Sequence, residues 1–154
     1  MNVLKIQQEL LKAVLTDRNR VSYYNQDSEH IFVTVNGQVG YILPTSELYV
    51  ELTAAQMMVS DLITDQIEEA MKPANRLEGT DEYRIGGTVR KYVWAEDKEE
   101  TAYFNTALLK NFDNPELYKA KLHPSSLAVV TENGIGADER KVVGIVMPYN
   151  IKAI

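Results

Sequence analysis

The sequence predicts an α+β domain built from two similar halves, each a helix followed by antiparallel strands. Apolar residues recur with a helical period in 2–16 and 53–71, and a third helix is expected near Thr101. Between them lie segments rich in Val, Ile, Tyr and Thr that are separated by turn residues. In addition, one pattern occurs twice, as "FVTVNGQVGYILP" at 32–44 and "AVVTENGIGADERKVVGIVMP" at 128–148. We therefore expect one domain over 1–154 with pseudo-twofold symmetry. Its first half is 1–52, its middle helix and linker 53–82, and its second half 83–154.

In the first half, apolar residues spaced along 2–16 predict an amphipathic helix. Strands are expected at 20–25, 30–35, 38–43 and 47–52. Asn36-Gly37 predicts a tight hairpin because both residues tolerate positive φ.

The middle helix is expected at 53–71, with Thr53 as its cap, and 72–83 reads as a linker. One or two strands are expected over 83–96, with Gly86-Gly87 as a turn or bulge, and a helix is expected to begin near Thr101. The last strands are expected at 116–121, 126–132 and 140–148.

The two halves can be aligned in sequence. The matched segments are Leu10-Leu11-Lys12 with Leu108-Leu109-Lys110, Tyr24 with Tyr118, 31–37 with 127–134, and 40–44 with 144–148. Two interpretations stay open. Any two hairpins that follow a helix look somewhat alike, or the unit is duplicated and its sheets lie edge to edge or pack together. Duplication has a physical reason, because a helix with three strands leaves an apolar face and an open edge that a second copy covers.

Composition limits the function classes. The net charge is −6 with a pI near 5.0, so duplex DNA is disfavoured as a partner unless a local basic face exists. The absence of cysteine excludes disulfides and thiolate metal sites. No apolar run is long enough for a membrane span, and 1–15 lacks the features of a signal peptide, so we expect a cytoplasmic protein that has no contact with a membrane.

The segment from Phe104 to Ile151 resembles the closing segment of bacterial DNA polymerase sliding clamps. The matching features are Leu108-Leu109 before the strands and Val146-Met147-Pro148-Tyr149 at the end. The resemblance implies a domain of two similar halves whose helices line a ring around duplex DNA and whose sheets form the outer wall. Since this chain supplies one such domain, a ring would require self-assembly.

The resemblance also supplies candidate site residues. The candidate DNA-facing residues are Lys5, Lys12, Arg18, Arg20 and Lys110. The candidate partner groove consists of Leu43, Pro44, Met147, Pro148 and Tyr149.

Catalytic motifs are weak. His30 and His123 have no metal-ligand spacing, and the serines beside them lack a GxSxG elbow. Neither "NGIGADER" nor "RIGGTVRK" has the spacing of a phosphate-binding loop. We therefore expect no enzyme activity and no cofactor.

Nine tyrosines against three phenylalanines indicate amphipathic aromatics, which are either half-buried strand residues or a partner-binding surface.

The leading functional hypothesis is a noncatalytic, clamp-like binding protein linked to DNA replication in a bacterium or phage. It would act through a protein partner or self-association. The first alternative is a generic α+β interaction or regulatory module that forms a homo-oligomer without binding DNA. The second is a small hydrolase or transferase.

Overall fold

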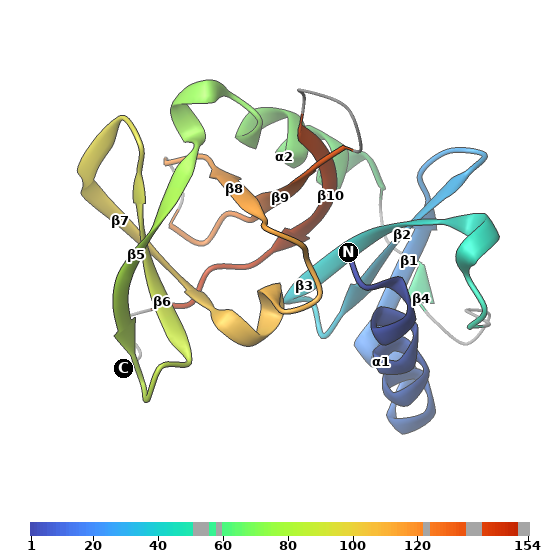
Figure 1. The fold of residues 1–154 in the computed structure, drawn as a ribbon. Helices are drawn as coiled ribbons and strands as arrows, with labels where there is room; N and C mark the ends of the chain where they lie inside the picture. The colour runs from blue at the N-terminus through green and yellow to red at the C-terminus, as the bar shows by residue number, and fades with distance from the viewer. Residues whose placement is uncertain (51–55, 58–59, 122–123, 135–139, 151–154) are drawn as a thin grey trace.

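The computed structural model describes residues 1–50, 56–57, 60–121, 124–134 and 140–150 (Figure 1). This part of the chain is α+β, as predicted, with two α-helices, a seven-stranded sheet and a three-stranded sheet. The elements are α1 (Val3–Thr16), β1 (Val21–Asn25), β2 (His30–Val35), β3 (Val39–Pro44), β4 (Gln56–Met57), α2 (Ser60–Ala70), β5 (Leu77–Arg84), β6 (Val89–Trp94), β7 (Asp97–Asn105), β8 (Glu116–Lys119), β9 (Ala128–Asn133) and β10 (Arg140–Val146). Short 3-10 helices are η1 (Arg18–Arg20), η2 (Thr45–Glu47), η3 (Pro73–Asn75) and η4 (Thr106–Leu109).

The large sheet has the order β4-β1-β2-β3-β10-β9-β8. It contains two antiparallel meanders, β1-β2-β3 and β8-β9-β10, which we call the first and second meander. Their last strands, β3 and β10, pair antiparallel, with Gly40 opposite Ile145 and Tyr41 opposite Gly144. Only β4 runs parallel to its neighbour, β1. The meanders therefore lie edge to edge.

The strand register is symmetric about the pair of β3 and β10. In the sequence alignment Gly40 corresponds to Gly144 and Tyr41 to Ile145, so the two observed pairs exchange with each other. In β1 and β8, however, Tyr23 lies opposite Val33 and Tyr118 opposite Val129, so Tyr118 corresponds by register to Tyr23 and not to Tyr24. A common origin of the meanders stays a prediction.

The predicted helix near Thr101 was wrong, because this segment is the end of β7 followed by η4. Ala102 and Phe104 alternate into the core opposite β6, a period of two that favours a strand. The Asn105 side chain then accepts a hydrogen bond from the Ala107 amide and caps only one 3-10 turn. Over its described residues the second half therefore has no α-helix equivalent to α1.

Three other boundaries differ from the prediction. The expected linker 72–83 holds η3 and most of β5. The middle helix is shorter than 53–71 and begins at Ser60, while Thr53 lies outside the described residues. The expected strand 47–52 starts inside η2 and has no strand at 48–50, and 51–52 lie outside the described residues.

The two meanders are covered differently on the same face of the sheet. Ile6, Leu10 and Ala13 of α1 and the inward residues of the three-stranded sheet belong to one continuous apolar cluster. Figure 1 shows α1 beside the first meander and β5-β6-β7 beside the second. An isolated bridge between Arg76 and Tyr118 attaches the start of β5 to the edge strand β8.

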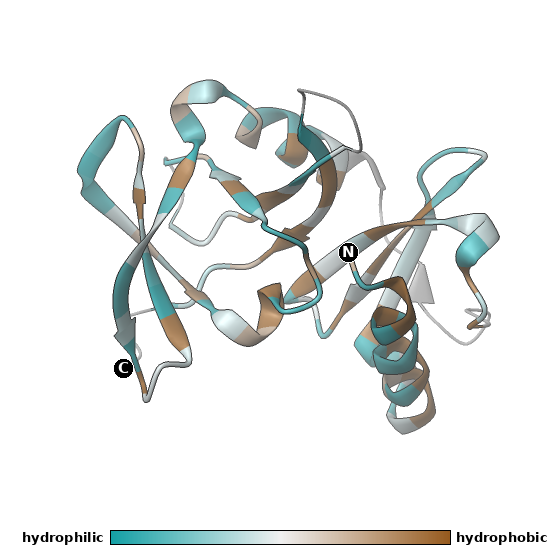
Figure 2. Ribbon diagram, viewed as in Figure 1, coloured by the Kyte–Doolittle hydropathy of each residue, from teal (hydrophilic) through white to brown (hydrophobic). Residues whose placement is uncertain are grey.

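The α2 helix packs on the opposite face. Its Ile63, Ile67 and Ala70 join a second cluster with strand residues such as Phe32 and Val129. Figure 2 shows hydrophobic residues along the central strands and on part of each helix. Burial on both faces explains why β2, β3 and β9 are nearly continuous apolar runs.

Candidate functional sites

The first candidate site is a cleft between α1 and η4, with a cavity volume of about 380 Å³, which we call the α1 cleft. Lys12, Arg20 and Lys110 line it, so the fold brings three of the five predicted DNA-facing residues together. Lys5 is exposed on α1 outside this lining, and the side chain of Arg18 lies outside the described part.

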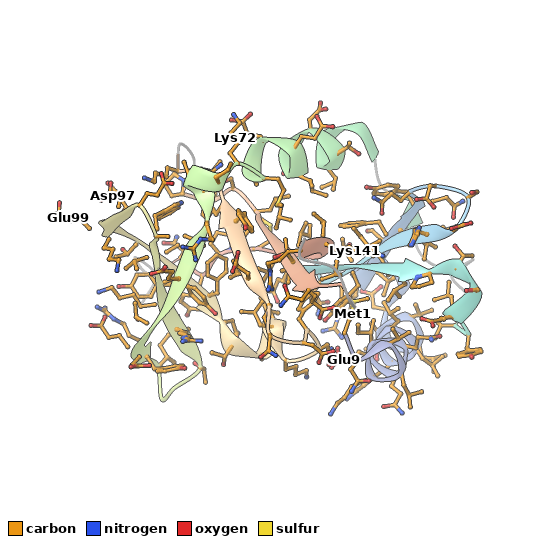
Figure 3. All side chains as sticks on the ribbon, turned by 45° about the horizontal axis from the view of Figure 1, so that its top comes forward. Met1, Glu9, Lys72, Asp97, Glu99 and Lys141 are labelled. Atoms are coloured by element: carbon orange, nitrogen blue, oxygen red, sulfur yellow. The ribbon has the colours of Figure 1, made fainter. Side chains whose placement is uncertain are left out.

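One carboxylate enters the α1 cleft. Glu9 forms an ion pair with Lys110, with Nζ and Oε1 2.9 Å apart, and accepts a hydrogen bond from Asn111 Nδ2 at 2.9 Å. Figure 3 shows Glu9 on α1. Arg20 Nε donates to Asn36 Oδ1 at 2.9 Å, which fixes its guanidinium beside the hairpin turn. The cleft therefore holds three cations and one carboxylate.

A second cleft, of about 620 Å³, lies between the three-stranded sheet and the segments around η4 and β8. We call it the arginine cleft, because Arg76, Arg90 and Arg140 line it together with Lys110. The sequence analysis missed these arginines. They come from strands or strand ends far apart in the chain, and no basic run or motif marks them.

Protein contacts hold the three arginines in place. The Arg90 guanidinium carbon lies 5.6 Å and 5.4 Å from the ring centres of Tyr83 and Tyr92, and its Nε donates to Thr80 O. Arg140 donates to Thr131 Oγ1, Asn133 Oδ1 and two backbone carbonyls. Arg76 pairs with Glu78 at 3.1 Å. These contacts hold three positive charges along the cleft, and those of Arg140 occupy four of its five N–H groups.

Lys110 lines both clefts. Among the described residues, the two clefts together present six cationic side chains against three carboxylates, those of Glu9, Glu78 and Glu116. This local balance is opposite in sign to the net charge of −6 for the whole chain.

The third site is a cavity of about 540 Å³ between the three-stranded sheet and the segment after β10, which we call the aromatic cavity. Met147, Pro148 and Tyr149 of the predicted partner groove line it, together with Trp94 and Tyr103. The Tyr149 amide donates to Tyr103 O at 2.7 Å and fastens this segment to β7.

Leu43 and Pro44 do not line the aromatic cavity. Leu43 is fully buried in the core, and Pro44 lies opposite His30 in the first meander. Because β3 and β10 are antiparallel, the ends of the two strands that carry Pro44 and Pro148 point in opposite directions. The Met147 amide accordingly donates to Gln38 O, before the start of β3. The five predicted groove residues therefore do not form one surface.

Lys119 also lines the aromatic cavity, and it is an almost completely buried lysine, with only 1% of the residue exposed. Its Nζ donates to Ser126 Oγ at 2.8 Å and to Ala120 O at 3.3 Å. Burial lowers the pKa of Lys119 to about 8 because the charged form loses hydration. The carbonyl of the same residue accepts a hydrogen bond from Trp94 Nε1.

The histidine and serine groups considered from the sequence do not form a catalytic array in the described part. His30 Nδ1 lies 3.0 Å from Asp27 Oδ1. The backbone amide of Glu29 and then the His30 side chain lower the pKa of the Asp27 carboxyl. His123 lies outside the described residues.

Among the residues that the structure describes, no group of three or more His, Asp or Glu side chains could hold a metal ion. In the same part of the chain, no helix has the length and apolar character needed to cross a membrane.

Of the strand aromatics, Tyr92 and Trp94 are buried and Tyr83 is exposed. Tyr49, in the segment after η2, is also exposed. Most of the surface of Tyr92 and Trp94 is therefore buried by core packing, although both residues also border cavities.

Comparison with family models, with curated proteins and with solved structures finds no match for this chain.

Proposed function

We propose that this protein is a noncatalytic binding protein that holds the phosphate backbone of duplex DNA across the α1 cleft and the arginine cleft. The observation that carries the proposal is that Lys110 joins two cation-lined clefts. Nucleic-acid affinity depends on neutralising phosphates and releasing counterions, so a local excess of cations matters more than net charge.

The sequence resemblance to sliding clamps also favours the face with the α1 cleft as the face that binds DNA. In that family the helices of both halves face the DNA; here α1 borders the α1 cleft, and the second half contributes the 3-10 turn η4 in place of a helix. Assembly into a ring and a link to DNA replication in a bacterium or phage belong to this proposal and rest on the resemblance alone.

Fluorescence anisotropy with a labelled duplex tests the proposal. Affinity is expected to fall steeply between about 50 mM and 200 mM salt, because each neutralised phosphate releases counterions. Lys12→Ala, Arg20→Ala and Lys110→Ala should each weaken binding and reduce the slope of log K against log salt by about one.

Lys72→Ala is the matched control. Lys72 is an exposed lysine beside α2, outside the linings of both clefts, and the substitution removes the same charge (Figure 3). Binding that is absent at low salt, or that Lys72→Ala weakens as much as Lys110→Ala does, would rule out the proposal.

A second function, self-association without DNA, is favoured by an apolar stripe on α1. Leu4, Leu11 and Leu15 are 66%, 48% and 77% exposed and fall on one side of the helix, while Ile6, Leu10 and Ala13 face the core. A second copy related by a twofold axis would present the same leucines to this stripe.

Light scattering tests self-association. If the stripe forms a dimer interface, the wild-type molar mass should be twice the chain mass of 17.4 kDa, and Leu11→Glu should return it to the chain mass. A wild-type protein that stays monomeric at high concentration would exclude this function.

A further inference from the structure

Tyr83 is an exposed aromatic residue in the lining of the arginine cleft. It lies on β5 opposite Arg90 of β6, near the turn that joins the two strands, and the residue is 48% exposed. The Arg90 guanidinium carbon lies 5.6 Å from the centre of the Tyr83 ring, and Arg90 Nε donates to the Thr80 carbonyl. The guanidinium therefore restrains the ring, while nearly half of the residue stays open to a ligand.

Gly79, which also lines the cleft, makes room for this arrangement. It lies opposite Tyr92, and a Cβ built on it would come within 2.6 Å of the Arg90 guanidinium carbon. Because position 79 has no side chain, the guanidinium lies close to the β5 backbone and 5.4 Å from the Tyr92 ring centre. Arg90 thus contacts two tyrosines, and Tyr83 is the accessible one of the pair, since Tyr92 is only 9% exposed.

Two cations of the same lining are also accessible. The side chains of Lys110 and Arg76 are 54% and 39% exposed. Lys110 pairs with Glu9 through an ammonium that has three N–H groups. Arg76 pairs with Glu78 through Nη2, which in the described part of the chain leaves its Nε and Nη1 for a ligand. The cleft therefore combines an open aromatic ring with cationic donors for phosphate oxygens.

An open aromatic ring beside cations is an arrangement that suits single-stranded nucleic acid. Unpaired bases stack on aromatic side chains, while a positively charged groove follows the sugar-phosphate backbone. Inside a duplex both faces of each base are covered by neighbouring base pairs, so an aromatic side chain stacks on a base that has left the helix. The cleft volume of about 620 Å³ lies within the range of about 300–1,000 Å³ for small-ligand sites, which suits one nucleotide.

We propose that the arginine cleft binds an unpaired nucleotide of a DNA strand, with the base stacked on Tyr83 and the phosphate beside Lys110 and Arg76. This inference rests on the function proposed above and sharpens it. Because Lys110 also lines the α1 cleft, a backbone held in that cleft continues into the arginine cleft, where its strand is unpaired. The preferred ligand is then a duplex with a single-stranded overhang.

Fluorescence anisotropy at one fixed low salt concentration would compare a blunt duplex with the same duplex carrying a short thymidine overhang. The wild type should bind the overhang duplex about tenfold more tightly. Tyr83→Ala should abolish this preference and change the affinity for the blunt duplex by less than about twofold. Tyr83→Phe should retain the preference, because it keeps the ring. Displacement of the overhang duplex by equimolar free thymidine monophosphate would assign the cleft to free nucleotides and overturn the proposal.

Two further variants serve as controls. Tyr49→Ala removes the ring of another exposed tyrosine, outside the linings of both clefts, and should leave both affinities unchanged. Lys12→Ala changes a residue that lines the α1 cleft but not the arginine cleft. It should weaken both duplexes to the same degree and leave the preference for the overhang intact.

Crosslinking of the wild type covers the case in which Tyr83→Ala fails to fold. With 5-iododeoxyuridine in the overhang, irradiation should join the base to Tyr83, because this photoreaction favours a stacked aromatic ring. Peptide mass spectrometry would locate the crosslink. The inference is overturned if the overhang adds no affinity, if folded Tyr83→Ala keeps the preference, or if the crosslinks form away from Tyr83.

The same measurements separate this inference from the function on which it rests. A blunt duplex that binds as proposed, with no gain from the overhang, would overturn the inference and leave the proposed function standing. An overhang duplex that crosslinks to Tyr83, with no binding of the blunt duplex at low salt, would do the reverse.

Discussion

The first and second meanders have matching strand order and register, yet different elements cover them. The first lies under α1, whereas the second lies under a three-stranded sheet and one 3-10 turn. The sheet itself does not determine which cover forms. The segment 3–16 has apolar residues with a helical period. In 97–105 the apolar residues Ala102, Tyr103 and Phe104 are consecutive, and pairing with β6 makes this segment a strand.

The difference also positions the sites. The two covers, α1 and the three-stranded sheet, approach each other at η4, which follows β7. The α1 cleft lies there, between α1 and η4. The arginine cleft and the aromatic cavity are both bordered by the three-stranded sheet. Two identical covers would not produce this arrangement.

The largest expected effects test whether the two covers share one core. Leu10 of α1 and Phe104 of β7 are both fully buried in the same cluster. Leu10→Ala should lower the free energy of unfolding by about 3 kcal/mol and Phe104→Ala by about 4 kcal/mol, because each leaves a cavity. Urea denaturation should still show one transition. A biphasic curve in either variant would mean that the two covers unfold separately.

The junction of the meanders comes next in size. A Cβ on Gly144 would clash with Gly40 O and lie 2.8 Å from Phe112 Cζ, whereas one on Gly40 would meet mainly the ends of side chains. Gly144→Ala should therefore cost about 2–3 kcal/mol. Gly40→Ala is the matched comparison and should cost less, since side chains yield more easily than backbone. If urea denaturation gives the same loss of unfolding free energy for both variants, the packing around the two glycines is as symmetric as their register, and the expected difference is wrong.

Each cover is also fixed by buried polar contacts of smaller effect. Gln7 of α1 accepts hydrogen bonds from the Tyr49 and Val50 amides and donates to Glu47 O, and Trp94 donates to Lys119 O. Gln7→Ala should cost about 2 kcal/mol, because it leaves several backbone groups without a partner, and Trp94→Phe about 1 kcal/mol. Thermal denaturation with circular dichroism would rank them, and the reverse order would contradict this account.

A dependence on pH arises from the side of the three-stranded sheet. The pKa of Lys119 is lowered to about 8 in the folded chain, so the unfolded chain holds the proton more tightly. Stability should therefore rise as pH increases from about 8 towards the unfolded value near 10.4. Above about pH 10 the rise is opposed, because burial raises the pKa of Tyr41 and Tyr92. Urea midpoints measured across this range should rise in the wild type and stay flatter in Lys119→Met.

Local chemistry made parts of this protein predictable. Asn36 and Gly37 both have positive φ and form the expected hairpin turn, and Gly86 and Gly87 do the same between β5 and β6. The α1 helix, the first meander and β9 also lie where the sequence patterns predicted them. Their patterns depend on neighbours in the chain, which the sequence displays directly.

The remainder depended on contacts between distant segments. The 101–109 segment contains both a strand and a helix pattern, and pairing with β6 decided in favour of the strand. Arg76, Arg90 and Arg140 became one cleft, and Pro44 was separated from Pro148, through the order and direction of strands. By itself the sequence determined which segments alternate or turn and that the chain carries no cysteine. Only the tertiary structure decided where cationic side chains cluster and which lysine is buried away from water, because both depend on residues brought together across the fold.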